Sequence, residues 1–201
     1  MLITQGTRAA RGYDARNGTL LWTLPRQSEI AVPTPFVAHN LIYIASGYRP
    51  IRPVYAVRPT ARGEIYVAGG ETSSEHIAWS LPNGGSYMPT PIVYGDYMYI
   101  CQNDGILTCY HALTGKRAYK KRLRAKGGGV SFTGSPIAGD GHVYFPSEDG
   151  RVVVVKAGPK FEIVQTNHVN ENLLSTPAIS DGTMYFRTQN SLIAVGTKKD
   201  N

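Results

Sequence analysis

The sequence predicts an all-β fold, a partial β-propeller of four-stranded antiparallel blades in one domain over residues 1–201, and two observations carry this prediction. The chain has 13 Tyr, 22 Gly and 13 Pro residues, a composition that favours strands separated by tight turns. A Thr-Pro or Ser-Pro pair also recurs four times at spacings typical of propeller blades, and each time a tyrosine follows the proline by eight residues. The four copies are Thr34-Pro35 with Tyr43, Thr90-Pro91 with Tyr99, Ser135-Pro136 with Tyr144, and Thr176-Pro177 with Tyr185.

Each of these pairs opens a predicted hairpin, because a turn such as Tyr94-Gly95-Asp96 separates the proline strand from the tyrosine strand. A second turn, clearest in Asn103-Asp104-Gly105, leads to a third strand, and a fourth strand ends in an aromatic residue in the more complete copies. An insertion is expected between the third and fourth strands of the copy that contains Trp79. The predicted blades are 1–25 (partial), 33–82 with the insertion near 58–75, 89–123, 134–167 and 175–196 (partial).

The passage from third to fourth strand carries a longer motif. Segments 12–22 and 109–119 each have a small residue, a glycine six positions later and an aromatic residue ten positions later. This motif resembles that of the PQQ-like (pyrroloquinoline quinone) propeller family, in which the aromatic ring docks against the neighbouring blade. The copy near Val154 has no aromatic residue at that position. The expected docking residues are Gly12, Gly18, Trp22, Trp79, Gly115 and Tyr119.

Resemblance to this family implies a ring of seven or eight blades, of which this chain would form about half. Unpaired edges and blade faces would then remain at both ends, so we expect either upstream blades or self-association to cover them. The family contains non-enzymatic members, such as the lipoprotein of the outer-membrane assembly machinery, which present loops to partner proteins. It also contains quinoprotein dehydrogenases, which use PQQ with calcium.

Positive charge is concentrated in one stretch of the chain. Of the 21 Lys and Arg residues, seven lie in 116–126 without an acid among them, which leaves 14 to balance the 14 Asp and Glu residues. Such a run can bind an anionic polymer or lipid, or it can be a solvated edge strand whose charges discourage edge-to-edge association. Nucleic acid is a poor candidate, because only Tyr119 interrupts the run as a stacking aromatic.

The two cysteines are expected to be free and buried. If Asn103 pairs with Ile106 across the turn, Cys101 faces Thr108 and Cys109 faces Ile100. Under that register the two side chains point to opposite faces of the hairpin, which argues against a disulfide.

No catalytic, cofactor-binding or metal site is predicted in this segment. The five histidines are scattered, Cys-x-x-Cys is absent, and the glycine run 127–129 lacks the lysine of a phosphate-binding loop. A fragment of a PQQ-dependent dehydrogenase, with PQQ and calcium as cofactors, is the alternative. The third reading is binding of an anionic polymer or lipid through 116–126.

The leading hypothesis is a non-catalytic binding or scaffold module whose loops contact a protein partner. No apolar run is long enough to span a membrane, and no signal peptide is visible in this segment, so a periplasmic or exported location rests on the family resemblance. The expected partner-binding residues lie in loops on one face of the ring. They are Tyr48, Arg49, Arg52, Tyr87, Arg124, Lys126, Phe132, Asn170 and Glu171.

Overall fold

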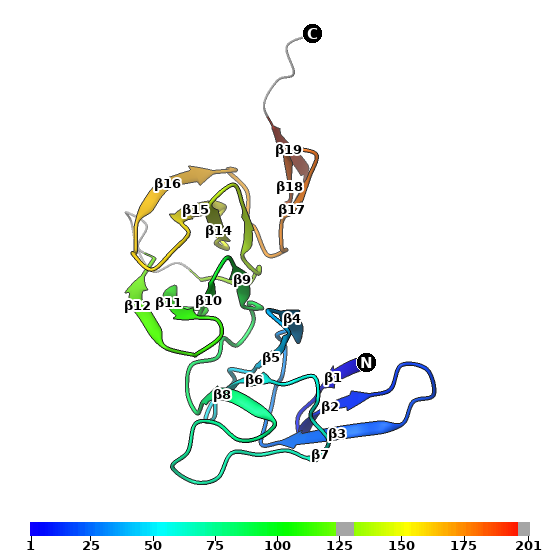
Figure 1. Ribbon diagram of the computed structural model, residues 1–201. Helices are drawn as coiled ribbons and strands as arrows, with labels where there is room; N and C mark the ends of the chain where they lie inside the picture. The colour runs from blue at the N-terminus through cyan, green and yellow to red at the C-terminus, as the bar shows by residue number, and fades with distance from the viewer. Residues whose placement is uncertain (124–130, 197–201) are drawn as a thin grey trace.

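Five β-sheets follow one another in chain order along an open, curved path (Figure 1). The computed structural model describes residues 1–123 and 131–196, and every regular element in these ranges is a strand. Among these residues there is no helix that is long and apolar enough to cross a membrane. The all-β propeller prediction is therefore confirmed.

The three central sheets are complete four-stranded blades. In each, the strands pair antiparallel with their neighbours in chain order, the first strand being innermost. Their strands are β4 (Phe36–Ala38), β5 (Leu41–Ala45), β6 (Val54–Val57) and β8 (Ile77–Leu81); β9 (Ile92–Tyr94), β10 (Tyr97–Cys101), β11 (Ile106–His111) and β12 (Arg117–Arg122); and β13 (Ile137–Gly139), β14 (His142–Pro146), β15 (Arg151–Lys156) and β16 (Ile163–His168).

The two end sheets lack one blade strand each within the described residues. The fifth sheet has three strands and lacks the outer, fourth strand of a blade. The first sheet begins with a strand that corresponds to the second strand of a blade, so it lacks the inner strand. Their strands are β17 (Ala178–Ser180), β18 (Thr183–Arg187) and β19 (Leu192–Gly196), and β1 (Leu2–Gln5), β2 (Ala9–Tyr13), β3 (Leu20–Pro25) and β7 (Gly63–Glu64).

Strand β7 lies in the segment between β6 and β8, yet it belongs to the first sheet. It runs parallel to β3, with Trp22 opposite Gly63. The amide of Ile65 donates to the carbonyl of Thr23 at 2.8 Å, and Ile65 is buried in the core between the first two sheets. The segment thus covers the outer edge of the first sheet with backbone hydrogen bonds, a role that the sequence did not predict.

An aromatic wedge joins the second blade to the third. The indole Nε1 of Trp79 donates to the carbonyl of Ala112 at 2.7 Å, and the hydroxyl of Tyr43 donates to the same carbonyl at 3.1 Å. A Cβ atom added to Gly115 would lie 2.7 Å from Trp79 Cδ2, and Gly115 has φ +67°. Only glycine fits this turn, because the ring occupies the space and the backbone is left-handed.

The other docking residues follow this scheme in part. A Cβ on Gly12 would lie 2.3 Å from the Trp22 ring, so the small residue makes room for the wedge within its own sheet. The Tyr119 ring packs against Phe161 of the fourth blade, with centroids 5.5 Å apart. Gly18 has no atom within 4 Å of its added Cβ, so this turn carries no wedge.

The Thr-Pro and Ser-Pro pairs link the blades at their inner strands. The amide of Thr34 donates to the hydroxyl of Thr90 at 3.0 Å, and the amide of Thr90 donates to that of Ser135 at 2.9 Å. Ser135 continues the series by donating to the Thr176 hydroxyl at 3.0 Å. The recurring hydroxyl residue is therefore a hydrogen-bond acceptor for the preceding blade, which explains why the repeat keeps Thr or Ser there.

Both cysteines are free and buried, but the predicted register is wrong by one residue. Cys101 lies opposite Leu107, and Cys109 lies opposite Tyr99, because the turn closes with the amide of Gln102 donating to the carbonyl of Ile106. The two side chains therefore share one face as diagonal neighbours, which are farther apart than directly opposed residues. Burial raises the pKa of the Cys109 thiol to about 12.

We predict that Gly115→Ala destabilises the protein by about 2–4 kcal/mol, because the new methyl group collides with Trp79 and the residue is held at positive φ. Gly95→Ala is the matched control, since Gly95 also has positive φ but open space around its added Cβ. It should cost only about 1 kcal/mol, the strain alone. Urea unfolding of both variants measures the difference, and equal losses would contradict the wedge.

Candidate functional site

A groove of about 580 Å³ lies between the second and third blades, on the side of the loops that follow the second and fourth strands. We call it the Arg52 groove. Four residues proposed from the sequence, Tyr48, Arg49, Arg52 and Tyr87, line it together. The remaining lining residues are Gly47, Gly85, Gln102, Asn103, Asp104, Ile106 and Lys120.

Two glycines allow the loops that form this groove to cross in close contact. A Cβ on Gly47 would lie 2.2 Å from the carbonyl carbon of Ser86, and a Cβ on Gly85 would lie 2.1 Å from the carbonyl oxygen of Ser46. The amide of Gly85 also donates to the carbonyl of Arg52 at 2.9 Å. This crossing brings together residues that are far apart in the sequence.

One wall of the groove is aromatic. The rings of Tyr48 and Tyr87 come from the two crossing loops, and their centroids lie 5.2 Å apart with an interplanar angle of 50°. Such a tilted pair gives a rigid surface with an apolar face and hydroxyl groups at its rim. It is suited to pack against an apolar or aromatic side chain of a partner.

The guanidinium of Arg52 is oriented by neutral groups. Its Nε donates to Asn83 Oδ1 at 2.8 Å, and its Nη1 donates to Gln102 Oε1 at 3.4 Å. Within the described part of the chain, no carboxylate forms an ion pair with Arg52. Arginine has five N–H donors, so this fixed side chain retains donors and its full charge for an anionic ligand.

The acidic residue in the groove, Asp104, already has hydrogen-bond and ion-pair partners within the molecule. The Asp104 carboxylate accepts a hydrogen bond from the amide of Ile106 at 3.2 Å and pairs with the Arg122 guanidinium at 3.3 Å. Arg122 thus offsets the charge of Asp104, while Arg49, Arg52 and Lys120 have no ion-pair partner among the residues that the structure describes. The groove is therefore positively charged.

The other residues proposed from the sequence do not line the Arg52 groove. Arg124 and Lys126 lie outside the described residues. Phe132 is 1% exposed in the core between the third and fourth blades, so the expectation that it contacts a partner does not agree with its burial. Asn170 is exposed in the loop before the fifth sheet, next to Glu171.

Glu171 caps the turn between β18 and β19. Its carboxylate accepts from the Ser191 hydroxyl at 2.8 Å, from the Asn190 amide at 2.9 Å and from the Thr188 hydroxyl at 2.9 Å. These hydrogen bonds, that from Ser191 first, lower the pKa of the Glu171 carboxyl from its usual value. The side chain is thus used inside the molecule to join the fifth sheet to the loop before it.

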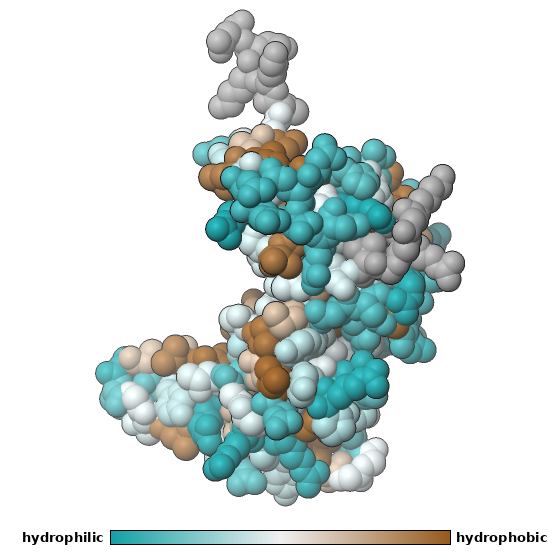
Figure 2. Space-filling model, turned by 180° about the vertical axis from the view of Figure 1, so that it is seen from behind, coloured by the Kyte–Doolittle hydropathy of each residue, from teal (hydrophilic) through white to brown (hydrophobic). Residues whose placement is uncertain are grey.

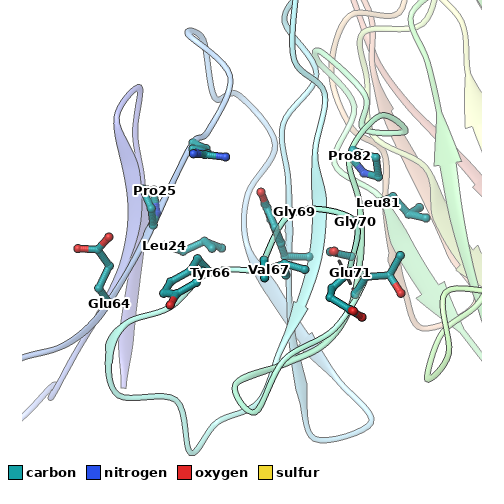
Figure 3. Close-up of a pocket in the computed structure, with 15 residues that line it drawn as sticks. Leu24, Pro25, Glu64, Tyr66, Val67, Gly69, Gly70, Glu71, Leu81 and Pro82 are labelled. Atoms are coloured by element: carbon teal, nitrogen blue, oxygen red, sulfur yellow. Dashed lines mark hydrogen bonds between the residues drawn. The ribbon is translucent and has the colours of Figure 1, made fainter.

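A second cavity, of about 720 Å³, lies between the outer parts of the first and second blades (Figure 3). The segment that carries β7 forms one side of it, with Tyr66 and Val67, and Leu24 and Leu81 come from the outer strands. Its charged residues are Arg26, Glu64 and Glu71. The sequence predicted the insertion but gave no signal for this cavity, because the cavity depends on the insertion reaching the neighbouring sheet.

The described residues do not fit a PQQ and calcium site. Calcium requires several oxygen ligands, carboxylates above all. Throughout 1–123 and 131–196, no three His, Cys, Asp or Glu side chains gather in a group that could hold a metal ion. Cys101 and Cys109 are buried in the core between the third and fourth blades and are not adjacent in the sequence.

Comparison with known families agrees with the repeat and the sheet order. A family model described as outer membrane protein assembly factor BamB matches residues 6–199. The chain belongs to this family. No curated protein sequence matches the chain.

Solved structures with the same fold are numerous. BamB from Moraxella catarrhalis has a TM-score of 0.65 and 16% identity, over 98% of this chain and 57% of that chain. A quinohemoprotein alcohol dehydrogenase from Pseudomonas putida HK5 has a TM-score of 0.61 and 15% identity, over 83% of this chain and 29% of that chain. The computationally designed Ika4 protein has a TM-score of 0.59 and 9% identity, over 89% of this chain and 98% of that chain. This chain thus spans little more than half of the matched BamB structure.

Proposed function

We propose that this protein is a non-catalytic binding or scaffold module of the bacterial cell envelope that presents the Arg52 groove to a protein partner. The observation that carries the proposal is the convergence of two tyrosines and an oriented arginine on one surface groove formed by crossing loops. Aromatic residues and arginine are enriched at protein interfaces and account for a large share of their binding energy.

The groove is suited to bind a carboxylate group of the partner that lies next to an apolar side chain. Arg52 is held in place before binding, so little side-chain entropy is lost when a partner carboxylate accepts its free N–H groups. Arg49 and Lys120 add positive charge, which speeds the encounter with an acidic segment. The Tyr48 and Tyr87 rings then offer the adjoining apolar surface.

The family supports the cell-envelope role. Its description, an outer membrane protein assembly factor, names a process carried out by proteins in contact with one another. We propose the same process and a periplasmic location for this chain. The quinoprotein match supports the fold alone, at 15% identity.

We test the site with a photo-crosslinking amino acid placed at Tyr48 or Tyr87, expressed in cells that make the natural partners. We expect one discrete crosslinked protein from both positions, because the two rings face the same ligand. Adding Arg52→Glu should abolish the crosslink, whereas Arg62→Glu, an exposed arginine outside the groove, should leave it unchanged.

Crosslinks that persist after Arg52→Glu would show that the groove does not hold the partner. Stoichiometric retention of PQQ after incubation with calcium would favour the dehydrogenase hypothesis and would contradict the non-catalytic proposal.

We further propose that additional blades, or a second copy of the chain, cover the two end sheets. Figure 2 shows hydrophobic surface on the first sheet, at the lower left, and on the fifth, near the top. Leu192 on β19 and Tyr185 on β18 share the face of the fifth sheet that points away from the fourth blade and are 71% and 37% exposed, and Leu2 on β1 is 57% exposed. Blade faces between the other sheets are buried in continuous cores, so these exposed faces are unmatched.

We therefore predict that the isolated 201-residue chain associates in solution. Light scattering should give a mass above 21.9 kDa, the mass of one chain, because association removes the apolar end faces from water. Leu192→Glu with Tyr185→Glu should return the mass toward that of a monomer. A wild-type chain that stays monomeric and does not bind an apolar dye would contradict unmatched end faces.

A further inference from the structure

The outer strand of the third blade differs in charge from every other outer strand of the described chain. β12 contains Arg117, Lys120, Lys121 and Arg122, and Lys116 precedes it. The sequences of β3, β8 and β16 contain no Lys, Arg, Asp or Glu at all. Five cations, set against a net charge of +7 for the chain, therefore lie along one rim of the structure, and a general need for charged edge strands does not account for them.

These cations are available to a ligand. Arg117, Lys120, Lys121 and Arg122 are exposed, and in the described chain only Arg122 has an acidic partner, Asp104. β12 is the last strand of its sheet, so no described strand pairs with its outer edge. Lys116, Arg117, Lys120 and Lys121 are thus left without an acidic partner in the described chain.

The charges lie on both faces of the blade edge. Lys120 lines the Arg52 groove on the side of the second blade. Lys121 shares the opposite face with Tyr119, which is packed toward the fourth blade. A ligand bound in a groove would contact the cations on only one face of the blade. A broad surface that meets the outer edge of the blade would contact the cations on both faces.

The described part of β12 presents no exposed aromatic ring beside this charge. Tyr119 is 9% exposed and covered by Phe161, so it offers no ring for nucleobases. Exposed cations on a broad edge, without a stacking aromatic, match the surface of a membrane that contains anionic lipids better than a nucleic acid.

We propose that the surface formed by Lys116, Arg117, Lys120, Lys121 and Arg122, which we call the β12 rim, binds a membrane that contains anionic lipids. This contact would orient the propeller on that membrane. The lipid phosphates accept hydrogen bonds from the Lys and Arg side chains. This surface is separate from the Arg52 groove, except for Lys120, which borders both. A partner protein and a membrane can therefore be bound at the same time.

The test uses flotation with vesicles of phosphatidylcholine that contain phosphatidylglycerol. The variant Lys116→Gln, Arg117→Gln, Lys121→Gln removes three rim charges and leaves Lys120 and Arg122 in place. Each juxtamembrane cation changes binding about fivefold, so we expect the partition coefficient to fall roughly 100-fold. Wild-type binding should also fall as salt rises and should be lost on pure phosphatidylcholine.

The matched control is Arg8→Gln, Arg62→Gln, Arg187→Gln, which removes three exposed charges away from β12 and should leave vesicle binding within twofold of wild type. Equal losses in the two triple variants would overturn the proposal, because they would show an effect of net charge alone. Retention on heparin without vesicle binding would also overturn it, in favour of an anionic polymer. The crosslink from Tyr87 should persist in the rim variant, which separates failure here from failure of the groove.

Discussion

The docking of an aromatic ring from one blade onto the backbone of the next is the contact on which this structure depends. Trp79 fills the space over Gly115 and donates to the Ala112 carbonyl, so its ring is buried and its N–H is satisfied at once. A buried aromatic side chain contributes about 2–3 kcal/mol from apolar area alone. Because the acceptor is a main-chain carbonyl in the neighbouring sheet, the contact fixes the position of one blade relative to the next. The Arg52 groove, which lies between these two blades, exists only if that position is fixed.

The repeated features of the fold could be predicted from the sequence, and the unrepeated ones could not. The Thr-Pro and Ser-Pro pairs and the motif that ends in Trp22 or Tyr119 recur at constant spacing, so each copy supports the others. β7 occurs once and has two residues in parallel pairing, so it leaves no periodic signal. The cysteine register was wrong because the turn closes one residue earlier, at Gln102, and nothing in Asn103-Asp104-Gly105 distinguishes the two closures.

Individual residues of the candidate site were proposed from the sequence, but their arrangement in space was not. Tyr48, Arg52 and Tyr87 were proposed because they lie in predicted loops on one face of the ring. Their convergence depends on the crossing at Gly47 and Gly85, a long-range contact that turn patterns do not encode. Phe132 was expected to contact a partner because it lies in a predicted loop on that face, yet its ring packs against Gly105, whose added Cβ would lie 2.9 Å from Phe132 Cε2.

The groove and the β12 rim give the third blade two functions in this account. Gln102, Asn103 and Asp104 belong to the groove at the inner turn, and the basic side chains belong to the outer strand of the same sheet. A rigid blade would hold a bound partner at a fixed height above a surface. This arrangement suits a scaffold, whose effect on an assembly comes from position rather than from chemistry.

Hydrogen–deuterium exchange of the Trp79→Ala variant tests the interblade wedge most directly. The account predicts faster exchange on both sides of the blade boundary, in β8 and also in the turn 111–116 of the third blade, whose Ala112 carbonyl accepts from Trp79. Faster exchange confined to β6 and β8, with the turn 111–116 as protected as in the wild type, would contradict it.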